Sequence, residues 1–114
     1  MNEKASALLL DQLEQAVRQA LIYVDGMTRE DFLADLRTQQ AVVLNLLIMG
    51  ESATKLMDRH PEVVARAPDI AWRSMRGMRN RIAHGYHEID MEIVWETLDG
   101  VLPALARDLA ALRA

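Results

Sequence analysis

The chain contains no cysteine, which excludes disulfide bonds and cysteine-ligated zinc sites. Aromatic residues are also scarce, with one Phe, two Trp and two Tyr among 114 residues. Leu, Ala, Val and Met fill the apolar positions instead, a composition that favours helices. No stretch alternates convincingly between apolar and polar residues, so the sequence predicts no strand.

Long hydrophobic runs and phosphate-binding loops are missing as well. The longest apolar run, residues 41–49, is interrupted by Asn45 and is far too short to span a membrane. The polar N-terminus carries no signal peptide, and we therefore expect a soluble, cytoplasmic protein that does not enter a membrane. There is no Gly-rich loop and no G-x-S-x-G elbow. At this length, with 51% hydrophobic and 26% charged residues, we expect one globular domain over residues 1–114.

Apolar residues at three- and four-residue spacing predict four long helices. Their approximate ranges are 3–24, 36–58, 70–83 and 90–113. Gly26 is expected to stop the first helix, and Thr28 with Asp31 forms a capping box that opens a short helical turn. Gly100 and Pro103 predict a kink in the last helix. The predicted fold is all-α: an antiparallel bundle of four long helices with short extra helical turns.

The helix at 36–58 is apolar on two opposite faces, which indicates burial on both sides. One face is expected to carry Leu36, Val43, Leu44, Leu47 and Ile48, and the other Val42, Leu46, Met49, Ala53 and Met57. A chain of this size has few internal partners for a second face, so we expect a homodimer. Glu51 falls within the first of these faces, where a carboxylate needs a partner. We expect an arginine from the following helix to supply it in a structural ion pair, which we favour over a catalytic role.

Positive charge is concentrated in one segment of an acidic chain. The net charge is −4, yet Arg73, Arg76, Arg79 and Arg81 stand within nine positions, and no acidic residue lies between positions 69 and 88. Without these four arginines, 9 basic residues would face 17 acidic ones. Solubility does not require such a concentration of one sign, so the segment indicates a binding site for an anion.

A helical projection separates two faces of this basic helix at 100° per residue. The core stripe is expected to hold Ala71, Met75, Met78 and Ile82. The opposite face is expected to hold Arg73, Arg76, Asn80 and His84, with Arg79 at the border between the two. Gly85 is expected to end the helix in the left-handed conformation, which would place His84 and Tyr86 on either side of the terminus.

Arg79 and His84 are suited to RNA cleavage without a metal. In that reaction the 2′-hydroxyl of RNA attacks the adjacent phosphate, so the site must move protons near neutral pH and neutralise growing negative charge. Histidine serves the first need and arginine the second. Asn80 could hold the imidazole or a phosphate, and Arg73, Arg76 and Arg81 could bind the flanking backbone.

Two other interpretations of the same residues remain open. A histidine in the last turn of a helix often only complements the helix dipole, and R-x4-H is short enough to occur by chance. His84 and His87 with Glu88 or Asp90 form the one cluster with metal-ligand chemistry, but Gly85 interrupts it. We therefore predict neither a metal site nor a bound cofactor.

Residues 68–86 resemble the HEPN superfamily, and more closely the HepT-type toxins, whose signature is R-x4-H-x-Y with a polar residue after the arginine. Arg79, Asn80, His84 and Tyr86 match that signature. Supporting matches are Gly50-Glu51, Ile89-Asp90, Val94-Trp95 and Leu102-Pro103, so the resemblance extends over about residues 40–110.

The resemblance implies a metal-independent endoribonuclease that acts as a homodimer, with Arg79, Asn80 and His84 as catalytic residues in a shared cleft. It implies a type VII-like toxin–antitoxin pair in which an MNT-type nucleotidyltransferase is the antitoxin and attaches AMP to Tyr86. Bulk and negative charge there would block an RNA-cleaving cleft. The alternative is a non-catalytic subunit that binds nucleotide or substrate for such a nucleotidyltransferase.

Overall fold

The computed structural model describes residues 2–113, and these residues form helices with no strand among them. The elements are α1 (Asn2–Tyr23), α2 (Arg29–Leu33), α3 (Leu36–Arg59), α4 (Pro61–Ala65), α5 (Trp72–His84), the 3-10 turn η1 (Tyr86–Glu88), α6 (Met91–Glu96), the π-helical segment η2 (Thr97–Val101) and α7 (Leu102–Arg113). The predicted all-α fold is confirmed, and the long helices begin and end within two residues of the predicted positions.

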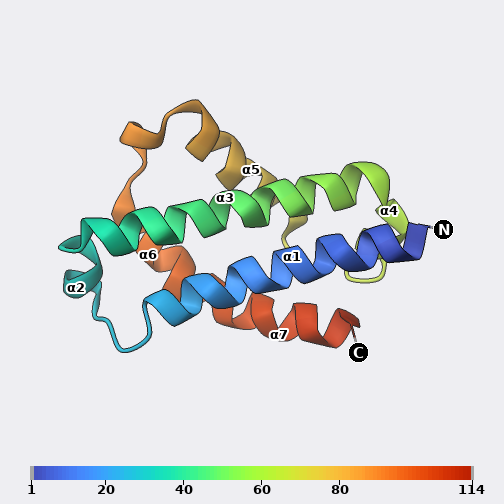
Figure 1. The fold of residues 1–114 in the computed structure, drawn as a ribbon, viewed down its shortest axis with the longest axis horizontal. Coiled ribbons are helices and arrows are strands. Elements are labelled where there is room, and N and C mark those ends of the chain that lie inside the picture. The colour runs from blue at the N-terminus through green and yellow to red at the C-terminus, as the bar shows by residue number, and fades with distance from the viewer. Residues whose placement is uncertain (1, 114) are drawn as a thin grey trace.

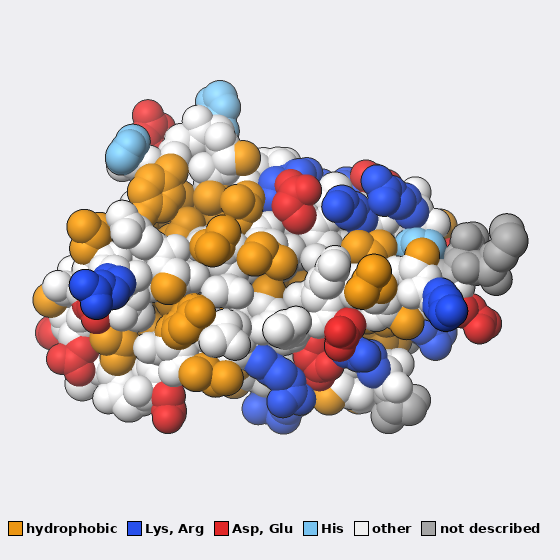
Figure 2. Space-filling view, in the orientation of Figure 1, with side chains coloured by type: hydrophobic (Ala, Val, Ile, Leu, Met, Phe, Trp, Pro, Cys, Tyr) orange, Lys and Arg blue, Asp and Glu red, His pale blue; other side chains and the backbone are white. Residues whose placement is uncertain are grey.

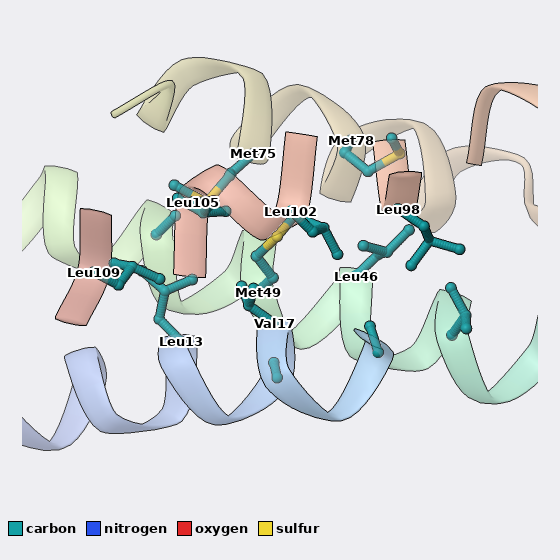
Figure 3. Close-up of a cluster of buried hydrophobic side chains, with 14 of the residues drawn as sticks. Leu13, Val17, Leu46, Met49, Met75, Met78, Leu98, Leu102, Leu105 and Leu109 are labelled. Carbon is teal, nitrogen blue, oxygen red and sulfur yellow. The ribbon is translucent and has the colours of Figure 1, made fainter. Parts of the chain in front are cut away.

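The helix α3 is the centre of the arrangement. It runs antiparallel beside α1 for most of its length, α5 packs on another side of α3, and α7 packs on α1 (Figure 1). One hydrophobic cluster joins these helices, and its largest fully buried side chains are leucines, valines and Phe32. Figure 3 shows side chains from α1, α3, α5 and the last helices meeting in this core. Each large side chain removed from water there contributes about 1.5–3 kcal/mol.

Local sequence signals fix several helix ends. Gly26 has φ 79°, the left-handed conformation expected where α1 stops. The predicted capping box is present, because Thr28 Oγ1 accepts from the N–H of Asp31 while the Asp31 carboxylate accepts from the N–H of Thr28. At the start of α3, the Asp35 carboxylate accepts hydrogen bonds from the hydroxyl and from the N–H of Thr38, and the hydroxyl has the larger effect on the Asp35 pKa. These hydrogen bonds hold the pKa of Asp35 below its ordinary value.

The predicted kink in the last helix takes the form of a π-helical segment. It contains Gly100 and is followed directly by α7, in which Pro103 is the second residue. The apolar spacing of the last helix predicts an inner face of Ile93, Val94, Leu98, Leu102, Leu105, Leu109 and Leu112. Val94 and the leucines at 98, 102, 105 and 109 are buried as predicted. Ile93, which we expected on the inner face, is instead 50% exposed, because Val94 occupies the inward position one residue later.

Three further expectations were wrong, two about side-chain burial and one about the backbone at Gly85. Ala71 precedes α5 and is exposed, and Trp72 takes the buried position while its Nε1–H donates to the Ala67 carbonyl at 2.9 Å. Gly85 has φ −157°, so α5 ends in extended backbone rather than in a left-handed residue. Val43 is buried within the core and does not lie on the outer face of α3.

Of the remaining residues of that face, Leu47 is partly buried against the core and the other three are exposed to solvent. Leu36, Leu44 and Ile48 are 63%, 56% and 38% exposed, and we refer to these three residues as the exposed α3 face. Figure 2 shows hydrophobic side chains gathered on the side of the molecule that α3 and α1 present to the viewer. Within residues 2–113, no helix combines the length and the apolar character needed to cross a membrane.

Candidate functional site

The contact between α3 and α5 depends on a glycine. A Cβ atom added at Gly50 would lie 2.7 Å from the backbone oxygen of Met75 and closer still to the Cβ atom of Arg79. Only a residue without a side chain allows the two helices to approach this closely. This close approach places the base of the Arg79 side chain directly against α3.

Next to Gly50, the Glu51 carboxylate accepts from Nη1 of Arg79 at 2.5 Å. The pairing of Glu51 with the basic helix is therefore confirmed. The Arg79 side chain is 22% exposed and that of Glu51 is 45% exposed, so the pair lies at the surface rather than in the core. A guanidinium has five N–H donors, and Glu51 uses one of them, which leaves donors for a second anion.

An open hollow of about 710 Å³ surrounds this ion pair. It is lined by Glu51, Arg79, Asn80, Arg81, Ala83 and His84, and we call it the basic hollow. Asn80, Arg81 and His84 are exposed within it. The structure thus brings together four of the residues that the sequence singled out, from the last two turns of α5.

The other candidates lie outside the basic hollow. Arg73 is exposed near the start of α5, and Arg76 donates to the Asp58 carboxylate of α3 at 2.6 Å. Tyr86 begins η1 and is half-buried, with its ring edge-on to that of His87 at a centroid separation of 5.5 Å. Tyr86 is two residues beyond His84 along the chain but does not line the hollow.

The three histidines lie in different surroundings. His84 lines the basic hollow, His87 is exposed on η1, and His60 is buried between α3 and α4. Across residues 2–113, no three His, Asp or Glu side chains converge in a way that could hold a metal ion. The basic side chains that line the hollow are Arg79, Arg81 and His84.

Sequence reasoning missed two features near this site. It did not identify Gly50 as the contact that seats Arg79, although a glycine inside an otherwise strong helical pattern is a signal of close packing. It also did not anticipate a groove on the other side of α5, between that helix and the last helices. Burial patterns within single helices carry no information about a gap between two of them.

Comparison with protein families gives a match over residues 13–112 to the model described as "Ribonuclease HepT-like". The chain belongs to this HepT-like family. The matched region contains α3, α5 and all of the residues that line the basic hollow.

Individual relatives agree with this membership. The HepT-like chain is 33% identical over 107 residues to "Probable ribonuclease HepT" of Thermococcus cleftensis, covering 90% of this chain and 94% of that protein. It is 30% identical over 97 residues to "Putative RNase MJ0127" of Methanocaldococcus jannaschii, with 85% and 77% of the two chains covered. It is 31% identical over 86 residues to "Putative RNase TTE0752" of Caldanaerobacter subterraneus, with 75% and 74% covered. No solved structure matches the chain significantly.

Proposed function

We propose that this chain is a metal-independent endoribonuclease with Arg79, Asn80 and His84 as its catalytic residues. One observation carries the proposal: in a chain of the ribonuclease HepT-like family, a histidine and an arginine line the same solvent-open hollow. The open shape of the hollow suits a polymer, because an RNA strand can lie across it without being threaded through an enclosed pocket.

The hollow contains groups suited to both parts of the cleavage reaction, proton transfer and charge neutralisation. The 2′-oxygen of a ribose attacks the adjacent phosphorus and loses its proton, a 2′,3′-cyclic phosphate forms, and the bond from phosphorus to the 5′-oxygen breaks. The departing 5′-oxygen gains a proton. His84 exchanges one of these protons, and Arg79 neutralises the charge on the pentacovalent phosphorus with the donors that Glu51 leaves free. Asn80 holds a phosphate oxygen or the imidazole.

The flanking arginines bind the RNA backbone beyond the cleaved bond. Arg81 does so from the hollow itself, whereas Arg73 and Arg76 extend the positive surface along α5. In Figure 2, basic side chains lie along the upper edge of the view, with acidic ones among them. Arg76 exchanges Asp58 for a phosphate when RNA binds.

The enzyme acts as a homodimer. A single imidazole in each hollow can hold or release one proton at a time, while the reaction needs both a base and an acid. Glu51 lines the hollow and lies about one turn beyond Ile48 and two turns beyond Leu44, so the exposed α3 face continues to the edge of the site. Burying that face between two copies would bring two basic hollows, and two copies of His84, to one cleft.

The biological role is that of a toxin in a two-component pair, acting on RNA in the cytoplasm. The antitoxin is an MNT-type nucleotidyltransferase that transfers AMP to the hydroxyl of Tyr86. Tyr86 stands on the turn that follows His84, so an attached AMP would add bulk and negative charge at the exit of the hollow. No cofactor is needed for the cleavage step.

The test is RNA cleavage by purified His84→Ala and Arg79→Ala proteins in the presence of a chelator. Each should lose roughly 10²- to 10⁴-fold in rate while circular dichroism stays unchanged. Arg107→Ala, which removes an exposed arginine of α7, is the matched control and should cleave at the wild-type rate. Heterodimers of one wild-type and one His84→Ala subunit keep a single imidazole in the shared cleft and should also be strongly impaired, because the reaction needs both a base and an acid.

Full activity in His84→Ala would rule out the mechanism, as would cleavage that depends on added metal. Wild-type protein that binds nucleotide but leaves RNA intact would instead support a non-catalytic subunit that serves a nucleotidyltransferase.

A further inference from the structure

A second hollow lies on the other side of α5. It has a volume of about 380 Å³ and separates α5 from η2 and α7. Its deepest lining is apolar and rich in sulfur: Met49, Met75, Met78, Leu102 and Leu105. Figure 3 shows these five side chains converging from three helices. We call it the methionine groove.

The methionine groove continues along α5. A neighbouring pocket of about 260 Å³ shares Met78, Arg81 and Ile93 with it and reaches His84 and Glu88. Together the two pockets run along α5, whose 13 residues extend over about 20 Å. Ile93 and Val101 stand half-exposed on the opposite wall. The groove therefore has two helical walls and a floor contributed by α3.

Carboxylates mark both ends of the groove. Asp69 and Asp108 line one end, and Glu88 and Asp90 line the other. None of the four forms an ion pair with any of residues 2–113, and the basic side chains that line the groove there are Arg81 and His84. This charge repels RNA phosphates, so the groove is not an extension of the basic hollow. It favours a ligand that is basic at both ends.

The wall formed by η2 is open and adaptable. Thr97, Gly100 and Val101 of the π-helical segment line the groove, and a Cβ atom at Gly100 would have no atom within 4 Å. Single-turn π segments recur at functional sites. Methionine side chains adjust to differently shaped partners, which is why they are common on surfaces that bind helices.

We propose that the methionine groove binds an amphipathic helix of a partner protein. Two helical walls over a helical floor can receive a third helix that lays its apolar face into the gap. The bound helix carries apolar side chains along one face and Lys or Arg near both ends, opposite Asp69 with Asp108 and Glu88 with Asp90. It also contacts Arg81, which lines the basic hollow as well, so the partner sits against the rim of that site. The proposal does not depend on RNA cleavage.

A designed peptide serves as the probe. A fluorescein-labelled helix of roughly 18 residues, with leucines on one face and lysines near both ends, is long enough to fill the groove. Fluorescence anisotropy should show that it binds the protein at least about tenfold more tightly than the same peptide with glutamates in place of the lysines. Equal binding of the two peptides would contradict the charge argument.

Two matched pairs of variants locate the peptide. Gly100→Trp fills the groove and should weaken binding by about tenfold or more, whereas Ala110→Trp on the exposed side of α7 should not. Asp69→Lys with Asp108→Lys should weaken binding in the same way, and Glu3→Lys with Asp25→Lys, an identical change in charge away from the groove, should not.

Binding that Gly100→Trp leaves intact would place the peptide elsewhere, for example on the exposed α3 face, and would overturn the proposal. A shift from dimer to monomer in Gly100→Trp, seen by light scattering, would assign the groove to a second copy of this chain and would also overturn it. Loss of RNA cleavage in the Arg79→Ala protein bears on neither outcome, so failure of this proposal is distinguishable from failure of the enzymatic one.

Discussion

The two sides of α3 are held by different kinds of contact. Toward α1, buried leucines, valines and alanines interlock, and Leu13, Val17 and Leu46 are almost completely enclosed (Figure 3). Toward α5, Gly50 brings two backbones together, and the pairs Glu51–Arg79 and Asp58–Arg76 lie along the contact. The first side supplies stability through buried area, and the second determines where Arg79 stands. Stability and site geometry should therefore be separable by mutation.

The largest effect is expected on the α1 side. Leu13→Ala deletes a fully buried side chain and should lower the free energy of unfolding by about 2–5 kcal/mol. Urea denaturation measures this change, with Leu8→Ala as the control. Leu8 is 58% exposed on the same helix, so its truncation should stay within roughly 0.5 kcal/mol of wild type. Comparable losses of unfolding free energy in Leu13→Ala and Leu8→Ala would show that buried area on the α1 side does not determine stability.

Gly50→Ala probes the α5 side. The added methyl group would collide with the Met75 backbone and with Arg79, so α5 must shift, at a cost of about 1–3 kcal/mol in stability. We expect RNA cleavage to fall by about 10²-fold at a temperature where the variant is fully folded, because the arginine moves with its helix. Gly77→Ala in α5 is the control.

At Gly77 the nearest atom to an added Cβ is 4.0 Å away, so alanine there should stabilise the helix by roughly 0.5–1 kcal/mol and leave cleavage unchanged. Normal activity in Gly50→Ala would show that the tight contact is not what positions Arg79.

Glu51→Ala should have a smaller effect, because the Glu51–Arg79 pair is partly exposed and such pairs contribute at most about 1 kcal/mol. We expect a loss of activity of about fivefold, and Glu51→Gln should restore most of it by keeping an acceptor for the guanidinium. Asp11→Ala removes an exposed carboxylate paired with Arg113, outside α5 and the hollow, and should leave the cleavage rate unchanged. Glu51 is a positioning residue in this account, and equal losses in the Ala and Gln variants would refute that role.

The smallest effect is expected for Asp35, at the start of α3, the helix that contacts both α1 and α5. Because the pKa of Asp35 is lowered in the folded state, its contribution to stability is present above the ordinary carboxyl pKa and is lost as the pH falls below about 4. Asp35→Asn keeps a capping acceptor but cannot titrate. Its stability should therefore decline less than that of the wild type between about pH 5 and pH 3, as measured by thermal denaturation. Parallel declines would exclude this role for Asp35.

Periodicity and capping signals were enough to predict the helices, because each depends on residues close together in the sequence. Gly26 and the Thr28–Asp31 capping box are of this kind, as is Asp90, whose side chain accepts from the N–H of Glu92 at the start of α6. The arginine, asparagine and histidine of the basic hollow could also be predicted from the sequence, because they lie together at the end of one helix.

What the sequence did not reveal depends on contacts between distant segments. The α3–α5 approach at Gly50 and the gap between α5 and α7 are set by how whole helices pack against one another. Ala71 was misplaced because α5 begins one residue after it, and Ile93 because Val94 takes the inward position; the side chains expected to be buried further along both helices were placed correctly.

The exposed α3 face has a consequence for dosage. In the proposed homodimer the site is completed only when two copies bury Leu36, Leu44 and Ile48, so its formation follows mass action and the specific activity should fall on dilution. At low abundance the protein would then cause little RNA cleavage, while a modest rise in abundance would increase cleavage more than in proportion. A cell carrying this chain would experience a threshold in its abundance rather than a steady background of RNA damage.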